Sequence, residues 1–192
     1  MPRLRSNRPN AMSASLTRRQ FLRASLGLAA GLAIAPRAAF AIATREVREV
    51  GLHNVHTGDA GRFTYYENGA YVPEAMQALN HLLRDFRSNE QLPMDPMLLD
   101  MLYLLQAQTG SKRAYEVISA YRSPATNAML HATTEGVNPR SLHMEGRAID
   151  IRLPGAKLDW LADRAGEMQL GGVGLYRASQ FVHLDTGSIQ RW

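Results

Sequence analysis

The stretch RAIDIRL, residues 147–153, decides the fold because its alternation is that of a β-strand. Successive side chains of a strand point to opposite faces of the sheet. One face carries Ala148, Asp150 and Arg152, and the other carries Ile149 and Ile151. We therefore expect the isoleucine face to enter the core and Asp150 to lie on a polar face.

A second strand is predicted over residues 181–185, FVHLD. The same alternation places His183 and Asp185 on one face of this strand. If the two strands are neighbours in the sheet, Asp150 and His183 meet on a common polar face. His143 would then reach that face from the loop that precedes the first strand.

Two imidazoles and one carboxylate are a common set of zinc ligands. A catalytic zinc ion needs three protein ligands and an open fourth position for water. His143, Asp150 and His183 are therefore the candidate ligands of one Zn²⁺ ion per chain. Their spacing alone is a weak signal, because an isolated polar residue of these types is more often a solvated side chain or a helix cap.

The other elements surround this pair of strands. A hairpin is predicted from residues 44–50 and 61–66, helices over 75–86, 95–110, 126–132 and 158–168, and further strands over 115–118 and 173–176. Asp95 is the expected N-cap of the second helix and Gly110 its end, with Met97 and Met101 as core residues. The order of elements predicts an α+β fold with an antiparallel sheet and packed helices.

Residues 1–41 have the composition of an export signal: seven arginines, no acidic residue and an apolar run over 24–35. The pair Arg18-Arg19 is typical of the twin-arginine pathway, and Ala39-Phe40-Ala41 matches a cleavage site. We predict cleavage after Ala41, export to the periplasm and a single domain over 42–192. The apolar run is too short to span a bilayer, so no stable membrane span is expected.

Removing that signal changes the charge of the chain. The 22 basic residues fall to 15 against 17 acidic ones, a formal charge of −2, so the basic pI near 9.9 belongs mostly to the signal. A nucleic-acid partner therefore loses its main support. The chain has no cysteine, and its stability must come from packing or from a bound metal.

The surroundings of the candidate ligands resemble the zinc D-Ala-D-Ala metallopeptidases. Their pattern S-x-H-x-x-G-x-A-x-D appears at Ser141, His143, Gly146, Ala148 and Asp150, and is completed by the segment 181–187. The segments YRSPATN at 121–127, TTEGV at 133–137 and GVG at 172–174 are similar to the murein endopeptidase K branch. The resemblance covers roughly residues 79–192.

This resemblance implies a fold shared with hedgehog-type domains, one zinc ion held by His143, Asp150 and His183, and hydrolysis of peptide bonds in peptidoglycan cross-links. Zinc would polarise the scissile carbonyl and lower the pKa of its water toward about 7. The leading hypothesis is a periplasmic zinc endopeptidase. Its alternatives are a wall-binding module without turnover and a carboxypeptidase or dipeptidase that acts on small wall peptides.

The residue that accepts the proton from water is less clearly marked. Relatives often place an acidic general base three residues before the last ligand, where this chain has Gln180. Asp185 is the candidate for this role, and support of an imidazole ligand is its alternative. Glu145 is the reserve candidate, with a solvated loop carboxylate as its alternative.

Two further residues follow from the resemblance. Arg122 would steady the substrate carbonyl or the developing oxyanion, and a surface salt bridge is its alternative. Ser141 would contact the substrate, or else make a structural hydrogen bond in a turn. His53 and His56 have no acidic or cysteine partner at metal-ligand spacing, so a surface or turn role is expected for them.

Overall fold

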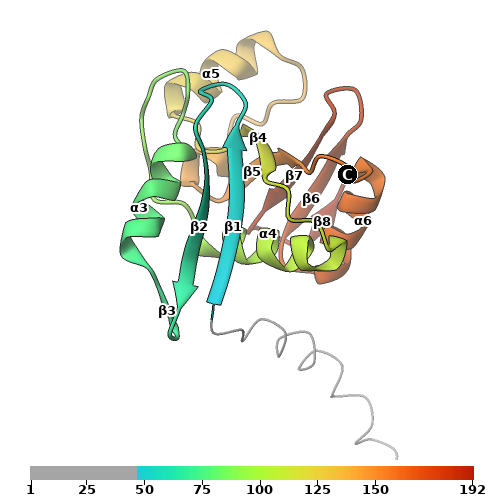
Figure 1. Cartoon of the computed structure of the whole chain (residues 1–192). Coiled ribbons are helices and arrows are strands. Elements are labelled where there is room, and N and C mark those ends of the chain that lie inside the picture. The colour runs from blue at the N-terminus through green and yellow to red at the C-terminus, as the bar shows by residue number, and fades with distance from the viewer. Residues whose placement is uncertain (1–46) are drawn as a thin grey trace, which may run out of the picture. The chain divides into compact units, whose positions relative to one another are not determined.

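The computed structural model describes residues 47–192 (Figure 1). The predicted twin-arginine signal over residues 1–41 and its cleavage after Ala41 lie outside the described residues. The elements in chain order are β1 (Val47–Asn54), β2 (Ala60–Glu67), β3 (Ala70–Tyr71), α3 (Pro73–Leu82), α4 (Pro96–Thr109), β4 (Tyr115–Ser119), α5 (Pro124–Thr133), the 3₁₀-helix η1 (Leu142–Glu145), β5 (Ala148–Arg152), α6 (Leu158–Met168), β6 (Gly172–Tyr176), β7 (Phe181–Asp185) and β8 (Gln190–Arg191).

The strands form one sheet in the order β3-β2-β1-β4-β5-β7-β6-β8. The predicted α+β class with an antiparallel sheet is confirmed for most of it, but β1 pairs with β4 and β6 pairs with β8 in parallel. Parallel neighbours need a long crossover, and the segment from β2 through α4 supplies it between β1 and β4. The two-residue strands β3 and β8 were not predicted, because they are too short to show a periodic pattern.

The predicted hairpin is confirmed, since β1 and β2 pair antiparallel. The first predicted helix ends four residues early, at Leu82 rather than at Phe86. The chain turns there because the amide of Asn89 donates to the Asp85 carbonyl at 2.7 Å, and the amide of Asp85 donates to the Glu90 carbonyl at 2.9 Å. These two bonds close a compact turn in place of a further helical turn.

Helix α4 has the predicted ends. The Asp95 carboxylate accepts from the amide of Met97 at 3.0 Å, and Gly110 has the left-handed conformation with φ 64°. Met97, predicted as a core residue, is 39% exposed, whereas Met101 is fully buried. The buried residues of α4 include Leu98, Leu99, Met101, Leu102 and Leu105, and Met97 lies just outside the edge of their arc, about 40° from Met101 around the helix.

The core and the polar residues lie on opposite faces of the central strands. Ile149 and Ile151 of β5, with Val182 and Leu184 of β7, belong to the hydrophobic core. Helix α4 packs on β1, α6 packs on β6 and β7, and the two helices touch, so both cover this face (Figure 1). Asp150 and His183 point to the other face. None of the four α-helices in residues 47–192 has the length and hydrophobicity that a bilayer crossing needs.

Candidate metal centre

Strand pairing aligns the candidate residues in a row across the sheet. Asp150 of β5 is the direct partner of His183 of β7 and lies beside Ser119 of β4. His183 is in turn the partner of Gly174 of β6. The sequence-based expectation that Asp150 and His183 meet on one face is therefore confirmed. The register of three strand pairs holds this row in place.

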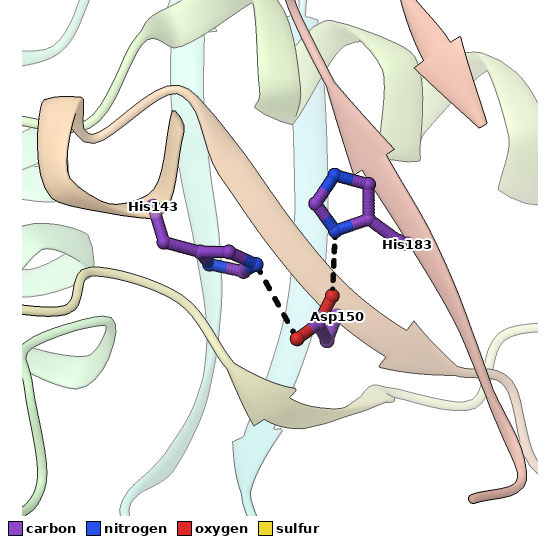
Figure 2. A group of neighbouring side chains, drawn as sticks. All are labelled: His143, Asp150 and His183. Atoms are coloured by element: carbon purple, nitrogen blue, oxygen red, sulfur yellow. Dashed lines mark hydrogen bonds and ion pairs between the residues drawn. The ribbon is translucent and has the colours of Figure 1, made fainter. Parts of the chain in front are cut away.

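His143, Asp150 and His183 converge as predicted (Figure 2). One potential ligand atom from each lies within 4.8 Å of the others, and this is the one such group of His, Cys, Asp and Glu found in residues 47–192. The Nε2 atom of His143 lies 3.3 Å from Asp150 Oδ2, and the Nδ1 atom of His183 lies 2.8 Å from Asp150 Oδ1. The two imidazoles thus face the carboxylate from two sides.

The backbone and a carbonyl oxygen hold His143 in this orientation. It lies in η1, whose N-cap Ser141 accepts from the amide of His143 at 3.4 Å and whose C-cap Gly146 has φ 68°. The Nδ1 atom of His143 lies 2.6 Å from the carbonyl oxygen of Ala120. A carbonyl can only accept, so Nδ1 carries the proton and Nε2 keeps its lone pair for the site.

Asp185 fixes the second imidazole from behind. The Nε2 atom of His183 lies 3.3 Å from Asp185 Oδ2. The other oxygen of Asp185 accepts from the amides of Gly172 at 3.1 Å and Gly187 at 2.7 Å. With Nε2 directed to Asp185, the Nδ1 atom of His183 is the nitrogen that faces Asp150. Such a carboxylate behind a metal-binding histidine sets the orientation of the ring.

The four groups shift one another's ionisation. Burial lowers the pKa of His143 and outweighs the opposing effect of Asp150. Burial acts to raise the pKa of Asp150, but its interactions with His143 and His183 outweigh it and hold that pKa well below the usual range. Burial also acts to lower the pKa of His183, but hydrogen bonds from its ring to Asp150 and Asp185 raise it. For Asp185 burial acts upward, and its hydrogen bonds lower the pKa.

Both carboxylates are therefore ionised at neutral pH, and the donor set suits a divalent cation. Two imidazole nitrogens and a carboxylate oxygen converge, and each imidazole directs its other nitrogen to an oxygen of the protein. The Nδ1 atom of His183 and the Oδ1 atom of Asp150 face each other at 2.8 Å. The geometry fits a metal ion with three protein ligands.

Arg122 and Ser141 lie at the same site, in different ways. The guanidinium of Arg122 donates through Nη2 to Asp150 Oδ2 at 2.6 Å and through Nε to Ser119 Oγ at 2.8 Å. The salt bridge named as the alternative for Arg122 is thus present, but it is largely buried and joins Arg122 to the candidate ligand. Ser141 caps η1 and also lines the cavity in front of the ligands.

The other acid and the glutamine lie away from the ligands. The side chain of Glu145 is 58% exposed and pairs with Arg147 at 3.2 Å. It is absent from the cavity lining, which fits a solvated loop carboxylate better than a base. Gln180 has φ 58° in the turn between β6 and β7, and its side chain bonds to the Arg177 carbonyl. The turn over residues 177–180 therefore contains no acidic residue that could replace the general base that relatives often have at this position.

The ligands open into a cavity of about 750 Å³. Sequence reasoning missed its aromatic wall, where Tyr176 stacks on Phe181 with centroids 4.7 Å apart and Trp192 lies 5.5 Å from His183. The indole N–H of Trp192 donates to the Tyr176 hydroxyl at 2.9 Å. The paired aromatics at the two ends of the β6–β7 turn were a visible signal. No sequence signal marked Trp192, because it follows the two-residue strand β8, which is too short to show a periodic pattern.

His56 also lines this cavity, although a surface or turn role was expected for it. It is exposed, as expected, and its ring stacks on Phe86 with centroids 3.9 Å apart. Neither His53 nor His56 joins a group that could hold a metal among the described residues.

Comparison with known proteins gives a consistent result. The family described as "Peptidoglycan L,D-endopeptidase MepK" matches residues 42–192. The chain is 40% identical over 167 residues to proteins of that name from Escherichia coli (strain K12) and Shigella flexneri, covering 86% of this chain and 92% of each relative. It is 36% identical over 170 residues to the probable peptidoglycan L,D-endopeptidase MepK of Haemophilus influenzae, covering 86% of this chain and 90% of that protein.

Proposed function

The chain belongs to the peptidoglycan L,D-endopeptidase MepK family, and from this premise we propose that it hydrolyses peptide bonds in the cross-links of peptidoglycan. The resemblance to D-Ala-D-Ala metallopeptidases of the murein endopeptidase K branch is thereby confirmed. One observation carries the proposal: three potential metal ligands converge on the floor of a cavity of about 750 Å³. A cavity of that volume admits a peptide.

We propose that the metal is Zn²⁺ and that its ligands are His143 Nε2, Asp150 and His183 Nδ1. Two nitrogens and one oxygen suit zinc, and a three-ligand set leaves a position open for water. The chemistry that such an ion supplies is Lewis acidity, which polarises a carbonyl and lowers the pKa of water. Affinity alone does not select zinc among divalent ions, so metal analysis of the purified protein is the direct test.

The remaining residues have positioning roles in this proposal. Arg122 holds Asp150 through Nη2, and its Nη1 atom has no hydrogen bond to residues 47–192, so Nη1 is available for a substrate carbonyl or oxyanion. Ser141 lines the cavity and contacts the substrate there. Asp185 supports His183, because its two oxygens already accept three hydrogen bonds. Because both carboxylate oxygens of Asp185 are already hydrogen-bonded, the residue fits support of His183 better than the role of general base.

We propose that the protein works in the periplasm. The relatives are named for action on peptidoglycan, which lies outside the cytoplasm. The arginine pair and apolar run within residues 1–41 support export by the twin-arginine pathway.

The test is to incubate the zinc-loaded protein with purified cross-linked muropeptide dimers and to identify the products by mass. Conversion of dimers to monomers is expected, and prior treatment with a chelator should abolish it until zinc is restored. Loss of a terminal residue alone would indicate a carboxypeptidase. Intact dimers together with binding to sacculi would indicate a wall-binding module and refute the enzyme.

A further inference from the structure

The cavity in front of the metal centre contains an arginine that the proposed chemistry does not use. Four arginines line the cavity: Arg87, Arg122, Arg140 and Arg191. Arg122 bonds to Asp150, and Arg191 pairs with Asp163 at 2.7 Å. Within residues 47–192 the side chain of Arg87 makes no ion pair or hydrogen bond. Its guanidinium therefore lines the cavity without an ion-pair partner among these residues.

Charge around the cavity does not balance. Its acidic residues are Glu135, Asp150 and Asp185, and the two aspartates are engaged by the histidines. Glu135 is exposed and forms no ion pair within the described residues, as is the case for Arg140. The negative charge of Glu135 and the positive charge of Arg140 cancel in the net charge of the cavity lining, so the positive charge of Arg87 remains. The rim is suited to a ligand that carries a negative charge.

Stacking orders the Arg87 side chain without using its donors. The guanidinium carbon of Arg87 lies 4.1 Å from the centroid of the Phe86 ring. Phe86 stacks on His56, whose Nε2 atom lies 3.1 Å from the carbonyl oxygen of Ile118. A guanidinium stacked by its face keeps the N–H groups of its edge free for a ligand. The stack ties Arg87 to the end of β4.

Asp85 holds Arg87 close to Arg122. One oxygen of Asp85 accepts from the amide of Arg87 and the other accepts from the amide of Ser123, both at 2.9 Å. Ser123 follows Arg122 in the chain, so one buried carboxylate joins the two arginine-bearing segments. Burial lowers the pKa of Arg87; the charge of Asp85 acts against this, and the smaller effect of the Arg122 charge adds to it. Two like charges held together are stabilised by an anion between or beside them.

We propose that Arg87 binds a free carboxylate of the peptide substrate in the cavity that contains the metal centre. This inference rests on the proposed peptidase function and adds a substrate requirement to it. A guanidinium edge donates two parallel hydrogen bonds to a carboxylate, and a carboxamide cannot accept both. The carboxylate has two possible sources in a peptide, the chain terminus and an acidic side chain.

The experiment compares three synthetic cross-linked peptides: one with both carboxylates free, one with the terminal carboxylate amidated and one with the side-chain carboxylate amidated. The protein should show a kcat/KM at least about tenfold higher for the free peptide than for one of the amides, which identifies the source of the carboxylate. Arg87→Gln should reduce that ratio to about 1, mainly through KM. Arg113→Gln, an exposed arginine outside this cavity, should keep the ratio of the unmodified protein.

Binding is measured separately, so that a failure of turnover does not hide the result. The cleavage products, with free or amidated carboxylates, are titrated calorimetrically into the unmodified protein and into Arg87→Gln. Circular dichroism confirms that the variant is folded. Weaker binding of the free product to Arg87→Gln, by about tenfold, supports the proposal even if the protein cleaves none of the peptides. Equal binding by both proteins, or a preference for carboxylate that survives in Arg87→Gln, overturns it.

Discussion

Replacing Asp85 by asparagine should destabilise the protein strongly at neutral pH and much less in acid. Asp85 is only 1% exposed and accepts hydrogen bonds from the amides of Arg87 and Ser123. Burial acts to raise its pKa, but hydrogen bonds from Thr126, Ser123 and Arg87 outweigh it and lower the pKa to about 2. In Asp85→Asn the side-chain NH2 group would face one of the two backbone N–H donors and could not accept its hydrogen bond. The stabilisation that comes from the negative charge of Asp85 would also be lost.

The pKa shift sets the size of the effect. A fall from 3.8 to about 2 corresponds to roughly 2 kcal/mol of stability, because one pKa unit is about 1.4 kcal/mol. The folded-state pKa is depressed, so this contribution is complete above pH 3.8 and is lost as the pH falls through about 2. About 1 kcal/mol should be lost by pH 3. At pH 7 the substitution should cost about 2–3 kcal/mol in total.

Urea unfolding followed by circular dichroism at pH 7 and pH 3 measures both quantities. The difference in free energy of unfolding between the unmodified protein and Asp85→Asn should shrink by about 1 kcal/mol between the two conditions. Asp159→Asn is the matched control, since its carboxylate is 63% exposed, and it should change stability by less than about 1 kcal/mol at either pH. A difference for Asp85→Asn that is the same at both pH values would refute the assigned ionisation.

Three further predictions concern the metal centre. Alanine at His143, Asp150 or His183 should lower zinc occupancy, measured by metal analysis, well below one ion per chain. The control His81→Ala, at the exposed end of α3, should leave occupancy unchanged. Full occupancy in a ligand variant would show that the replaced residue is not a ligand. Asp185→Asn should weaken zinc binding by about 10- to 100-fold and recover activity at saturating zinc; unchanged zinc affinity with lost turnover would instead identify Asp185 as the base. Gly172→Ala should also reduce zinc affinity, measured by competition with a chelator, because an added Cβ would lie 2.3 Å from Asp185 Oδ2 and displace that carboxylate. Unchanged affinity would show that the position of Asp185 does not affect zinc binding.

The elements that sequence reasoning located well are those with a local cause. The Asp95 cap and the left-handed Gly110 bound α4, and the stripe over residues 98–105 buries as its spacing predicts. Alternation alone assigned the faces of β5 and β7. The error at the end of α3 arose where a distant partner decided the outcome. Helix α3 stops at Leu82 because the Asp85 turn is anchored to Ser123, 38 positions away.

The triad of the metal centre was predicted by residue type, spacing and family resemblance, but its contact depends on strand register. Asp150 and His183 are 33 positions apart, and only their pairing in the sheet brings their side chains together. The same holds for the role of Asp185. Strand alternation placed it beside His183, whereas the two backbone amides that occupy its other oxygen come from β6 and the turn after β7.

The amino-acid sequence by itself determined which side chains could hold a metal, which strand faces they occupy and which family the chain resembles, since these follow from residue identity and short periodicity. Tertiary structure decided which nitrogen of each histidine faces the site, that Arg122 bonds to a candidate ligand, and that Arg87 lines the cavity with no ion pair to any residue of 47–192. Those features depend on hydrogen bonds and packing between segments far apart in the chain. No local pattern encodes them.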